Sequence, residues 1–397
     1  MWKLLQGHFI PKAVGEIMRQ TLKVRVLLTL SIIAVAQASW PAQSGRMPGK
    51  GTGSQAQSDD NPVRLRAEDV LLQVSFQSKL GKLPPRLDRA DFIVTEDDKR
   101  QQITSIMRTP ANVLLILDTS GDVTTLKNIN IHRELALKLI ESLGEEDKVA
   151  IVTYADKVAL LSSWTGDRAA LKKSLDWNFR PGPNSRLYDS LIYAADELLM
   201  KVTGRRSVVL LTDGVDTSLQ APVETALKAL HRARTTVYVV SQAAMLVHEL
   251  KPKILKRPPV WQWIDPVVRK RYQLLQQYVR KLEAGEGPLH TLAEETGGEI
   301  WDFEHRIRCA NTPKPFNGTF SEPRQPTVMI DCEMIRNQLI EEIGSEYIIA
   351  YSSERRSEDT KFHLIKVYST RTDLKVRVRR GIYAAKQLSE TVRSGNQ

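Results

Sequence analysis

The middle of the chain alternates between two hydrophobic patterns. Residues 113–117 and 149–154 are short apolar runs, as expected for strands that are buried on both faces of a sheet. Residues 126–143 instead have apolar residues at helical spacing, which predicts an amphipathic helix. The same patterns predict further elements, which are helices at 168–177, at 186–202 and after Pro222, and strands at 207–211 and 236–240. This alternation predicts an α/β, Rossmann-like fold with a doubly wound, mostly parallel sheet.

The two ends of the chain have a different pattern of apolar and polar residues. Short runs with alternating apolar and polar residues, separated by Gly, Pro and Asp, predict strands at 70–76, 91–95, 102–107, 347–351, 362–368 and 374–379. Neither end has enough strands to cover a core alone. We therefore expect both ends to meet in one small, discontinuous, β-sandwich-like domain with the α/β part inserted between them.

These patterns divide the chain into seven parts. We predict a signal peptide at 1–38, a disordered linker at 39–62, the two parts of the β domain at 63–110 and 345–384, the α/β domain at 111–304 with an insertion at 241–287, a loop and helix with the cysteines at 305–344, and a disordered tail at 385–397.

The first 38 residues have the pattern of an export signal. Basic residues precede an apolar run at 26–36 that is short for a membrane span, and Ala36 and Ala38 are small residues suited to a signal peptidase. We expect cleavage after Ala38 and a secreted or periplasmic protein. The long charged region before the apolar run suggests that translation starts at Met18. An uncleaved membrane anchor is the alternative.

Composition narrows the class of protein. The chain has 397 residues, 42% of them hydrophobic and 26% charged, which is typical of folded soluble proteins. A net charge of +11, partly in the leader, does not indicate nucleic-acid binding without a basic stripe. Cys309 and Cys332 are the two cysteines of the sequence. In an oxidising compartment we expect them to form a disulfide worth roughly 3 kcal/mol.

Three predicted loops carry the polar residues most suited to chemistry. The first has Asp118, Ser120 and Asp122 directly after a predicted strand, the second is 184–189 at a helix start, and the third is 212–216, with Asp213, after another strand. Because ligands of such sheets bind at the carboxyl ends of the strands, we expect these loops to converge. Carboxylate and hydroxyl oxygens are the donors that hard divalent cations prefer.

These three motifs resemble those of a known family. The segments LLILDTSGD, SRLYDSL and VVLLTDGVDTS, in that order, look like a von Willebrand factor type A domain, and DKVAIVTYAD, TVYVV and LAEETGGEIW match its flanking texture. Over residues 63–384 the arrangement is similar to the exported VWFA-related proteins of acidobacterial type, in which β segments precede and follow the domain.

The resemblance implies a metal-ion-dependent adhesion site. That site is built from a DxSxS motif, a hydroxyl residue on a second loop and an aspartate on a third, which correspond here to Asp118, Ser120, Asp122, Ser185 and Asp213. The implied cofactor is a divalent cation, with Mg²⁺ first and Ca²⁺ or Mn²⁺ as alternatives. Ser185 replaces threonine and keeps the hydroxyl. Asp122 replaces the second serine and adds a third carboxylate.

The extra carboxylate changes what the site is expected to bind. A third negative charge beside the metal opposes a further carboxylate from a partner, so Asp122 is expected to act as a built-in ligand. We expect Asp189 and Asp216 behind the ligands, in supporting or helix-capping positions, and Arg186 paired with one of these carboxylates. Asp at strand ends and Ser at helix starts are also common caps, so a metal-free domain is an alternative.

The insertion at 241–287 starts at the same edge of the sheet. Its basic residues, Arg257 among them, lie beside Trp261 and Trp263, a combination that suits protein or glycan recognition. The alternative is that both tryptophans hold the loop against the domain. Residues 267–282 then read as an amphipathic helix that packs on its neighbours.

The sequence therefore favours an exported, non-enzymatic module that binds a protein or a surface polymer, without nucleic acid, and with a membrane only through an uncleaved signal anchor. One alternative is a structural envelope protein with a metal-free type A domain. Another is an aspartate-based hydrolase, which is disfavoured because position 120 is Ser and because GxGxxG, HExxH, GxSxG and Walker motifs are missing from the sequence.

Overall fold

The computed structural model describes residues 69–78, 87–121, 129–178, 181–218, 220–256, 259, 263–302, 306–308, 329–353 and 361–383. All of them belong to the second of the two units into which the chain divides, Pro62–Gln397. The predicted signal peptide, linker and tail, and the predicted roles of Asp122, Arg257, Trp261 and Cys309, lie outside the described residues. Within those ranges, no helix has the length and apolarity needed to cross a membrane.

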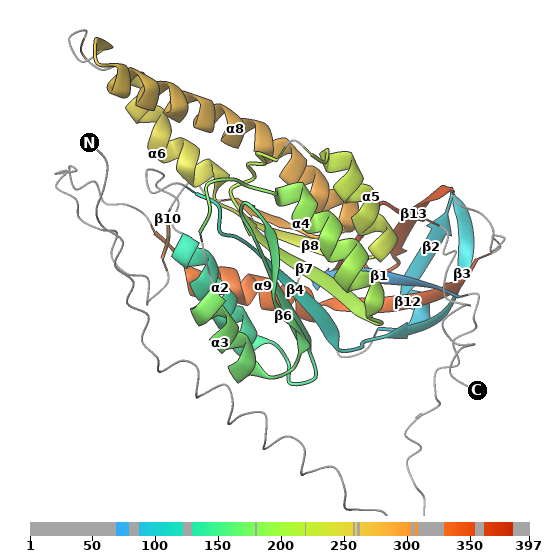
Figure 1. Cartoon of the computed structure of the whole chain (residues 1–397). Helices are drawn as coiled ribbons and strands as arrows, with labels where there is room; N and C mark the ends of the chain where they lie inside the picture. The colour runs from blue at the N-terminus through green and yellow to red at the C-terminus, as the bar shows by residue number, and fades with distance from the viewer. Residues whose placement is uncertain are drawn as a thin grey trace, which may run out of the picture. The chain divides into compact units, whose positions relative to one another are not determined.

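Six strands form the central sheet of the α/β part (Figure 1). Their order is β6-β5-β4-β7-β8-β9, and every neighbouring pair is parallel except β5 and β6. Their bounds are β4 (Ala111–Asp118), β5 (Lys148–Tyr154), β6 (Val158–Thr165), β7 (Arg205–Thr212), β8 (Thr236–Ser241) and β9 (Ile300–Asp302). The order reverses between β4 and β7, so the prediction of a doubly wound, mostly parallel sheet is confirmed. The antiparallel edge strand β6, which lacks a clean alternation of burial, was not predicted.

Helices cover both faces of this sheet. On one face, Val113, Leu115 and Leu117 of β4 pack against α2 (Ile129–Ser142), α3 (Arg168–Asn178) and α9 (Cys332–Gly344). On the other, Leu114 and Ile116 pack against α4 (Leu187–Tyr193), α5 (Val223–Ala233) and the end of α8 (Pro266–Thr296). Both faces of β4 are therefore buried, which explains its unbroken apolar sequence.

Strands from the two ends of the chain pair in a second, antiparallel sheet. Its order is β14-β1-β12-β3-β2-β13-β15, with β1 (Asp69–Ser78), β2 (Phe92–Glu96), β3 (Lys99–Met107), β12 (Glu346–Ser352), β13 (Phe362–Ser369), β14 (Leu374–Val378) and β15 (Gly381–Tyr383). Strand β1, from before the α/β part, pairs with β12 and β14 from after it. The rings of Phe76 in β1 and Phe92 in β2 stack 4.6 Å apart although two strands separate them in the sheet, so the sheet curls around a core of its own.

The insertion is a helical hairpin, which corrects the prediction of a loop followed by a helix at 267–282. Helix α6 (Ala243–Leu255) packs along α8, and α8 runs without a break for 31 residues through Pro288. Proline lacks the N–H that would bond to residue 284. Buried Leu282, Leu289 and Leu292 lie on both sides of that position, and their packing outweighs the local break. The start of α8 is capped by Asp265, which accepts a hydrogen bond from Val267 N at 2.8 Å.

The shorter elements complete the chain trace. The predicted helix at 186–202 begins as α4 and continues as a π-helical turn, η2 (Ala194–Leu198), and a 3₁₀ turn, η3 (Leu199–Lys201). A second 3₁₀ turn, η1 (Arg89–Asp91), precedes β2. Two short parallel strands, β10 (Arg306–Arg308) and β11 (Met329–Asp331), lie before α9.

A buried carboxylate joins the two sheets. Glu346 at the start of β12 is fully buried and accepts hydrogen bonds from Gln73 of β1 at 2.8 Å, Tyr238 of β8 at 2.9 Å and Ser207 of β7 at 2.7 Å. The guanidinium of Arg205 lies 3.9 Å from the same carboxylate. Burial raises the pKa of the Glu346 carboxyl, and the Arg205 charge opposes that shift. The antiparallel sheet is thus attached to the amino-terminal ends of β7 and β8.

Candidate functional site

The first loop of the candidate site starts where β4 ends. Asp118 is the last residue of the strand, and its side chain is fully buried. Its Oδ1 accepts hydrogen bonds from the backbone N of Ser120 at 2.8 Å and from Ser120 Oγ at 2.6 Å. Its Oδ2 accepts from Thr212 Oγ1, at the end of β7, at 3.4 Å. The carboxylate therefore holds its own loop in a tight turn and contacts the neighbouring strand end.

The second loop is bonded to both of the others. Gly121 N donates to Gly182 O at 2.8 Å, which joins the first loop to the second. Ser185 Oγ donates to Val215 O at 2.6 Å, and Ser185 N donates to Thr217 Oγ1 at 2.7 Å, which joins the second loop to the third. Residues 118–121, 182–186 and 212–217 thus form one connected set at the carboxyl edge of the sheet, beside the point where the strand order reverses. We call this set the candidate cation site.

The third loop is held by the inserted hairpin. Asp213 is nearly fully buried, and its Oδ1 accepts from Val215 N at 3.1 Å. Its Oδ2 accepts from the hydroxyl of Tyr278, in α8, at 2.8 Å. Helix α8 also passes directly over Gly214, because a Cβ on Gly285 would lie 2.3 Å from Gly214 O. The insertion therefore packs on the candidate cation site itself, a contact that the sequence alone did not reveal.

The negative charge of the site affects the pKa of two neighbouring tyrosine side chains. Burial raises the pKa of Tyr154 well above its usual range, and the Asp118 and Asp213 charges raise it further. Burial and then the Asp213 charge likewise raise the pKa of Tyr278, with a smaller effect of Asp118. Both phenols therefore feel both carboxylates and remain protonated at neutral pH. The two carboxylates belong to one electrostatic centre.

The acidic residues predicted behind the ligands have mainly local roles. Asp216 Oδ2 accepts a hydrogen bond from Tyr188 N, in the first turn of α4, at 3.0 Å, and its Oδ1 accepts from Ser218 N at 2.8 Å. Asp189 pairs with Arg186 at 3.3 Å, which is the kind of pairing expected for Arg186. Asp216 therefore caps a helix and a turn, and Asp189 is neutralised by its neighbour.

The side chain of His132 contacts the backbone of the first loop. His132 Nδ1 lies 2.8 Å from Asp118 O, and its Nε2 lies 2.8 Å from Gln242 Nε2. The ring of His132 thus bridges the backbone carbonyl of Asp118 and the side-chain amide of Gln242. Gln242 N in turn donates to Thr212 O at 2.9 Å. Non-covalent contacts through His132 and Gln242 therefore connect the ends of β4 and β7. Neither residue belongs to a recognisable motif.

The donor set fits a hard divalent cation. The protons of both serine hydroxyls are directed to protein acceptors, Ser120 to Asp118 and Ser185 to Val215 O, so their oxygen lone pairs can serve as ligands. With two buried carboxylates, this is an oxygen-only set of the kind that Mg²⁺, Mn²⁺ and Ca²⁺ accept. In the described ranges, no three His, Cys, Asp or Glu side chains are grouped to hold a metal. In this donor set, the hydroxyl oxygens of Ser120 and Ser185 complement the two carboxylates.

The hairpin residues predicted to bind a partner are described only in part. Trp263 is partly buried, and its ring meets that of Tyr272 edge-on at 5.2 Å. Tyr272 donates to Ile254 O at 2.5 Å and so ties α8 to α6. The indole of Trp263 thus packs within the hairpin. A partner-binding role for Trp261, Trp263 and Arg257 stays a prediction.

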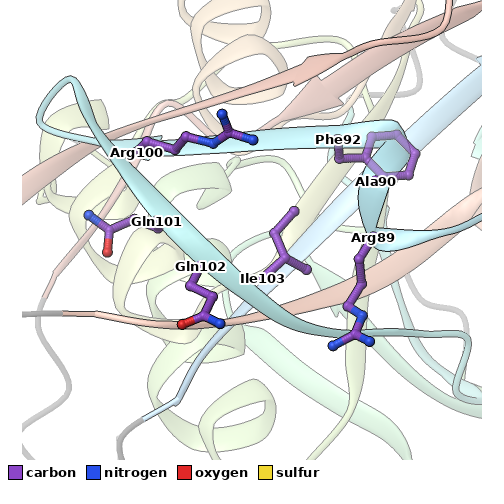
Figure 2. A pocket seen from close by; sticks show the side chains of 7 residues that line it. All are labelled: Arg89, Ala90, Phe92, Arg100, Gln101, Gln102 and Ile103. Atoms are coloured by element: carbon purple, nitrogen blue, oxygen red, sulfur yellow. The ribbon is translucent and has the colours of Figure 1, made fainter.

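A hollow of about 530 Å³ lies elsewhere, on the antiparallel sheet. Figure 2 shows its lining, which comes from η1, β2 and β3: Arg89, Ala90, Phe92, Arg100, Gln101, Gln102 and Ile103. None of these residues belongs to the candidate cation site. The hollow is therefore a separate feature of the β part of the molecule.

Comparison with known proteins identifies the class of the central part. The family model of the von Willebrand factor type A domain matches residues 112–257. This part of the chain is therefore a von Willebrand factor type A domain, as its three motifs predicted. The match ends just after α6, whereas the fold includes α8, β9 and α9 beyond it. No protein of curated function matches the chain in sequence.

Several solved structures are similar to part of the chain. BatB from Bacteroides thetaiotaomicron is 18% identical with a TM-score of 0.29, over 34% of this chain and 66% of that one. An aerotolerance-related membrane protein from Bacteroides fragilis is 19% identical with a TM-score of 0.29, over 34% and 67%. Proximal thread matrix protein 1 from the mussel byssus, with a zinc-occupied MIDAS motif, is 17% identical with a TM-score of 0.31, over 33% and 35%. The chain thus spans about two thirds of the bacterial structures and about a third of the mussel protein.

Proposed function

We propose that the protein is an exported, non-enzymatic interaction module whose type A domain holds a divalent cation and presents it to a protein or a surface polymer. One observation carries the proposal. The loops that bear Asp118, Ser185 and Asp213 are hydrogen-bonded to one another and surround two buried carboxylates at a single edge of the sheet. Type A domains commonly mediate protein interactions, and the class of the domain supports this reading.

The proposed ligands have distinct roles. Ser120 and Ser185 supply hydroxyl oxygens, while Asp118 and Asp213 supply negative charge. Asp122 adds a third carboxylate in this proposal and so makes the site less receptive to a carboxylate from a partner. The bound ion is Mg²⁺, with Ca²⁺ or Mn²⁺ as alternatives. When bound, it supplies a centre of positive charge that can attract an oxygen of the partner.

The hydrogen bonds made by the polar groups of the loops agree with a non-catalytic role. An aspartate-based hydrolase needs a second aspartate two residues after the first, and that position is Ser120. Ser185 gives its proton to a backbone carbonyl, which is not a base. The hydroxyl and carboxylate groups of the described loops thus stabilise the loops themselves.

The proposal places the protein in a secreted or periplasmic compartment. The leader pattern at 1–38 supports export, and so does the wider resemblance to exported VWFA-related proteins of acidobacterial type. Cys332 is fully buried at the first position of α9. A disulfide between Cys309 and Cys332 would fix the entry to that helix, and it belongs to the same proposal.

Thermal unfolding tests the cation site directly. The full chain is treated with EDTA, and Mg²⁺, Ca²⁺ or Mn²⁺ is then added back. A cation that binds only the folded state raises the unfolding free energy by about 2.7 kcal/mol at a hundredfold excess over its Kd. We expect this increment for the wild type and its loss in Ser185→Ala, which removes one proposed ligand.

Ser190→Ala is the matched control. Ser190 is also buried and also donates its hydroxyl proton to a backbone carbonyl, that of Leu187 at 2.6 Å, but it lies within α4 and outside the site. Both variants should lose about 1 kcal/mol in EDTA, and only Ser190→Ala should keep the cation increment. If no ion stabilises the wild type, or if both variants respond alike, the proposed site is wrong.

A further inference from the structure

The end of the inserted hairpin carries apolar side chains that its own packing does not use. Helices α6 and α8 pack through an inner cluster that includes Met245, Leu246, Leu250, Val279 and Leu282. On the outside, Leu255 is 80% exposed, Ile264 76%, Val267 73% and Leu274 55%. These are the four most exposed large hydrophobic side chains of the described residues. Such side chains are normally scattered singly, so their clustering on one hairpin indicates an interaction surface.

The exposed apolar side chains do not take part in the packing between the two helices. Val267 and Leu274 are seven residues apart on α8, close to two full turns, so they lie on the same side of the helix. Ile264 immediately precedes the N-cap residue of α8. Leu275 and Val279 belong to the inner cluster, which includes neither Val267 nor Leu274.

Basic side chains surround the apolar ones. Over the described residues 251–256, 259 and 263–274 there are six Lys and Arg residues and a single acidic residue, Asp265. Asp265 caps α8 through the backbone of Val267. The exposed basic residues are Lys251, Lys253 and Lys256 at the end of α6 and Arg269, Lys270 and Arg271 at the start of α8. Lys251 pairs with Glu283 of α8 at 2.8 Å, and the other five basic residues make the end of the hairpin positive as well as apolar.

From this combination we propose that the hairpin end is a membrane-binding element, which inserts Leu255, Ile264 and Val267 into the interface of an anionic lipid bilayer. Apolar residues beside a dense group of Lys and Arg are the pattern of interfacial membrane binding. Figure 1 shows that α6 and α8 extend side by side away from the strands. A lipid interface adapts around a protruding end of this kind, and its anionic headgroups complement the basic residues.

The candidate cation site stays clear of the bilayer in this arrangement. Tyr278, which contacts Asp213, lies three turns beyond Val267 on α8, or about 16 Å along the helix. Interfacial helices bury their apolar side only about 5–10 Å deep. The membrane contact is therefore independent of the proposed cation, and each can be tested without the other.

Vesicle sedimentation tests the proposal with the full chain. Vesicles of phosphatidylcholine alone are compared with vesicles that also contain phosphatidylglycerol, and we expect binding to the anionic vesicles. Lys253→Glu, Lys256→Glu and Lys270→Glu together should lower the partition coefficient by about 100-fold or more, because each basic side chain at an anionic surface contributes roughly fivefold. Leu255→Ser, Ile264→Ser and Val267→Ser together should lower it by about tenfold or more.

Matched variants separate the hairpin from the rest of the chain. Lys173→Glu, Lys228→Glu and Lys375→Glu change the net charge equally at exposed positions elsewhere, and Leu160→Ser with Met200→Ser removes exposed apolar side chains elsewhere. Neither set should alter vesicle binding. All of these positions are exposed, so each variant should unfold at the temperature of the wild type.

Three results would overturn the proposal. The first is a wild type that sediments with neither kind of vesicle. The second is equal loss of binding in the hairpin variants and in their matched controls, which would point to another segment such as the apolar leader. The third is full competition by soluble polyglutamate together with unchanged binding of the serine variants, which would identify an acidic protein, and not a bilayer, as the partner.

Discussion

At the scale of single residues, Tyr278 is the contact that ties the insertion to the candidate cation site. Its hydroxyl donates to the buried Asp213 carboxylate at 2.8 Å, and hydrogen bonds to charged groups contribute about 1.5–3 kcal/mol. Tyr278→Phe should lower the unfolding free energy by that amount in EDTA, as measured by urea denaturation. The cation increment should survive, because Tyr278 is not a proposed ligand.

Tyr272→Phe provides the comparison on the same helix. Tyr272 donates to the neutral carbonyl of Ile254, so its loss should cost only about 0.5–1.5 kcal/mol. Equal losses of unfolding free energy in the two variants would show that the hydrogen bond to the Asp213 carboxylate is no stronger than one to a neutral carbonyl. Loss of the cation increment in Tyr278→Phe would show instead that the phenol organises the ligands.

Part of the site could be predicted from sequence because its residues lie in short motifs. Asp118, Ser120 and Asp213 directly follow the apolar strands that position them, so the strand ends bring them together. Tyr278 and His132 could not be predicted in this way. Each lies on an amphipathic helix, where an aromatic or polar residue at an inward position usually serves packing, and only the tertiary structure shows which loop it contacts.

At the scale of elements, the position of α8 depends on a glycine. A Cβ on Gly285 would lie 2.3 Å from Gly214 O, whereas a Cβ on Gly287 would meet nothing within 4 Å. Gly285→Ala should therefore displace α8 from the third loop and cost about 1–3 kcal/mol as an overpacked contact. It should also weaken the cation increment, because the loop carries Asp213.

Gly287→Ala is the internal reference for that substitution. It removes the same glycine flexibility from the same helix without a clash, so it should stabilise the protein by up to about 1 kcal/mol. Urea denaturation of both variants, with and without Mg²⁺, gives the difference. Two variants of equal stability would mean that α8 does not depend on its close approach to Gly214.

The same helix shows where prediction from local pattern fails. Gly285, Gly287 and Pro288 disfavour a helix locally, so the helix predicted at 267–282 ends before them. The structure has one helix, because Val279 and Leu282 pack against α6 on one side of the glycines and residues 289–293 pack against the sheet on the other. Strands β4, β5, β7 and β8 were predictable, since burial on both faces dictates an unbroken apolar run. Strands β6 and β9 lie at the two edges of the sheet and have no such constraint.

At the scale of the whole molecule, one buried carboxylate connects the two sheets. Glu346 accepts hydrogen bonds from both sheets, and burial raises its pKa above the usual 4.5. An acid with a higher pKa in the folded state binds its proton more tightly there. Its contribution to stability is complete below pH 4.5 and is lost as the pH rises through the raised pKa.

Glu346→Gln tests this coupling, because glutamine resembles the protonated acid at every pH. The difference in unfolding free energy between wild type and variant should shift in favour of the variant as the pH rises above 4.5, by at most about 1.4 kcal/mol for each pH unit. Burial also raises the pKa of Glu342. Its contribution to the pH dependence of the unfolding free energy is present in both proteins. Glu341→Gln, at a neighbouring exposed position, is the control for the substitution itself. A constant difference for Glu346→Gln would mean that the junction stays ionised and is stabilised by Arg205.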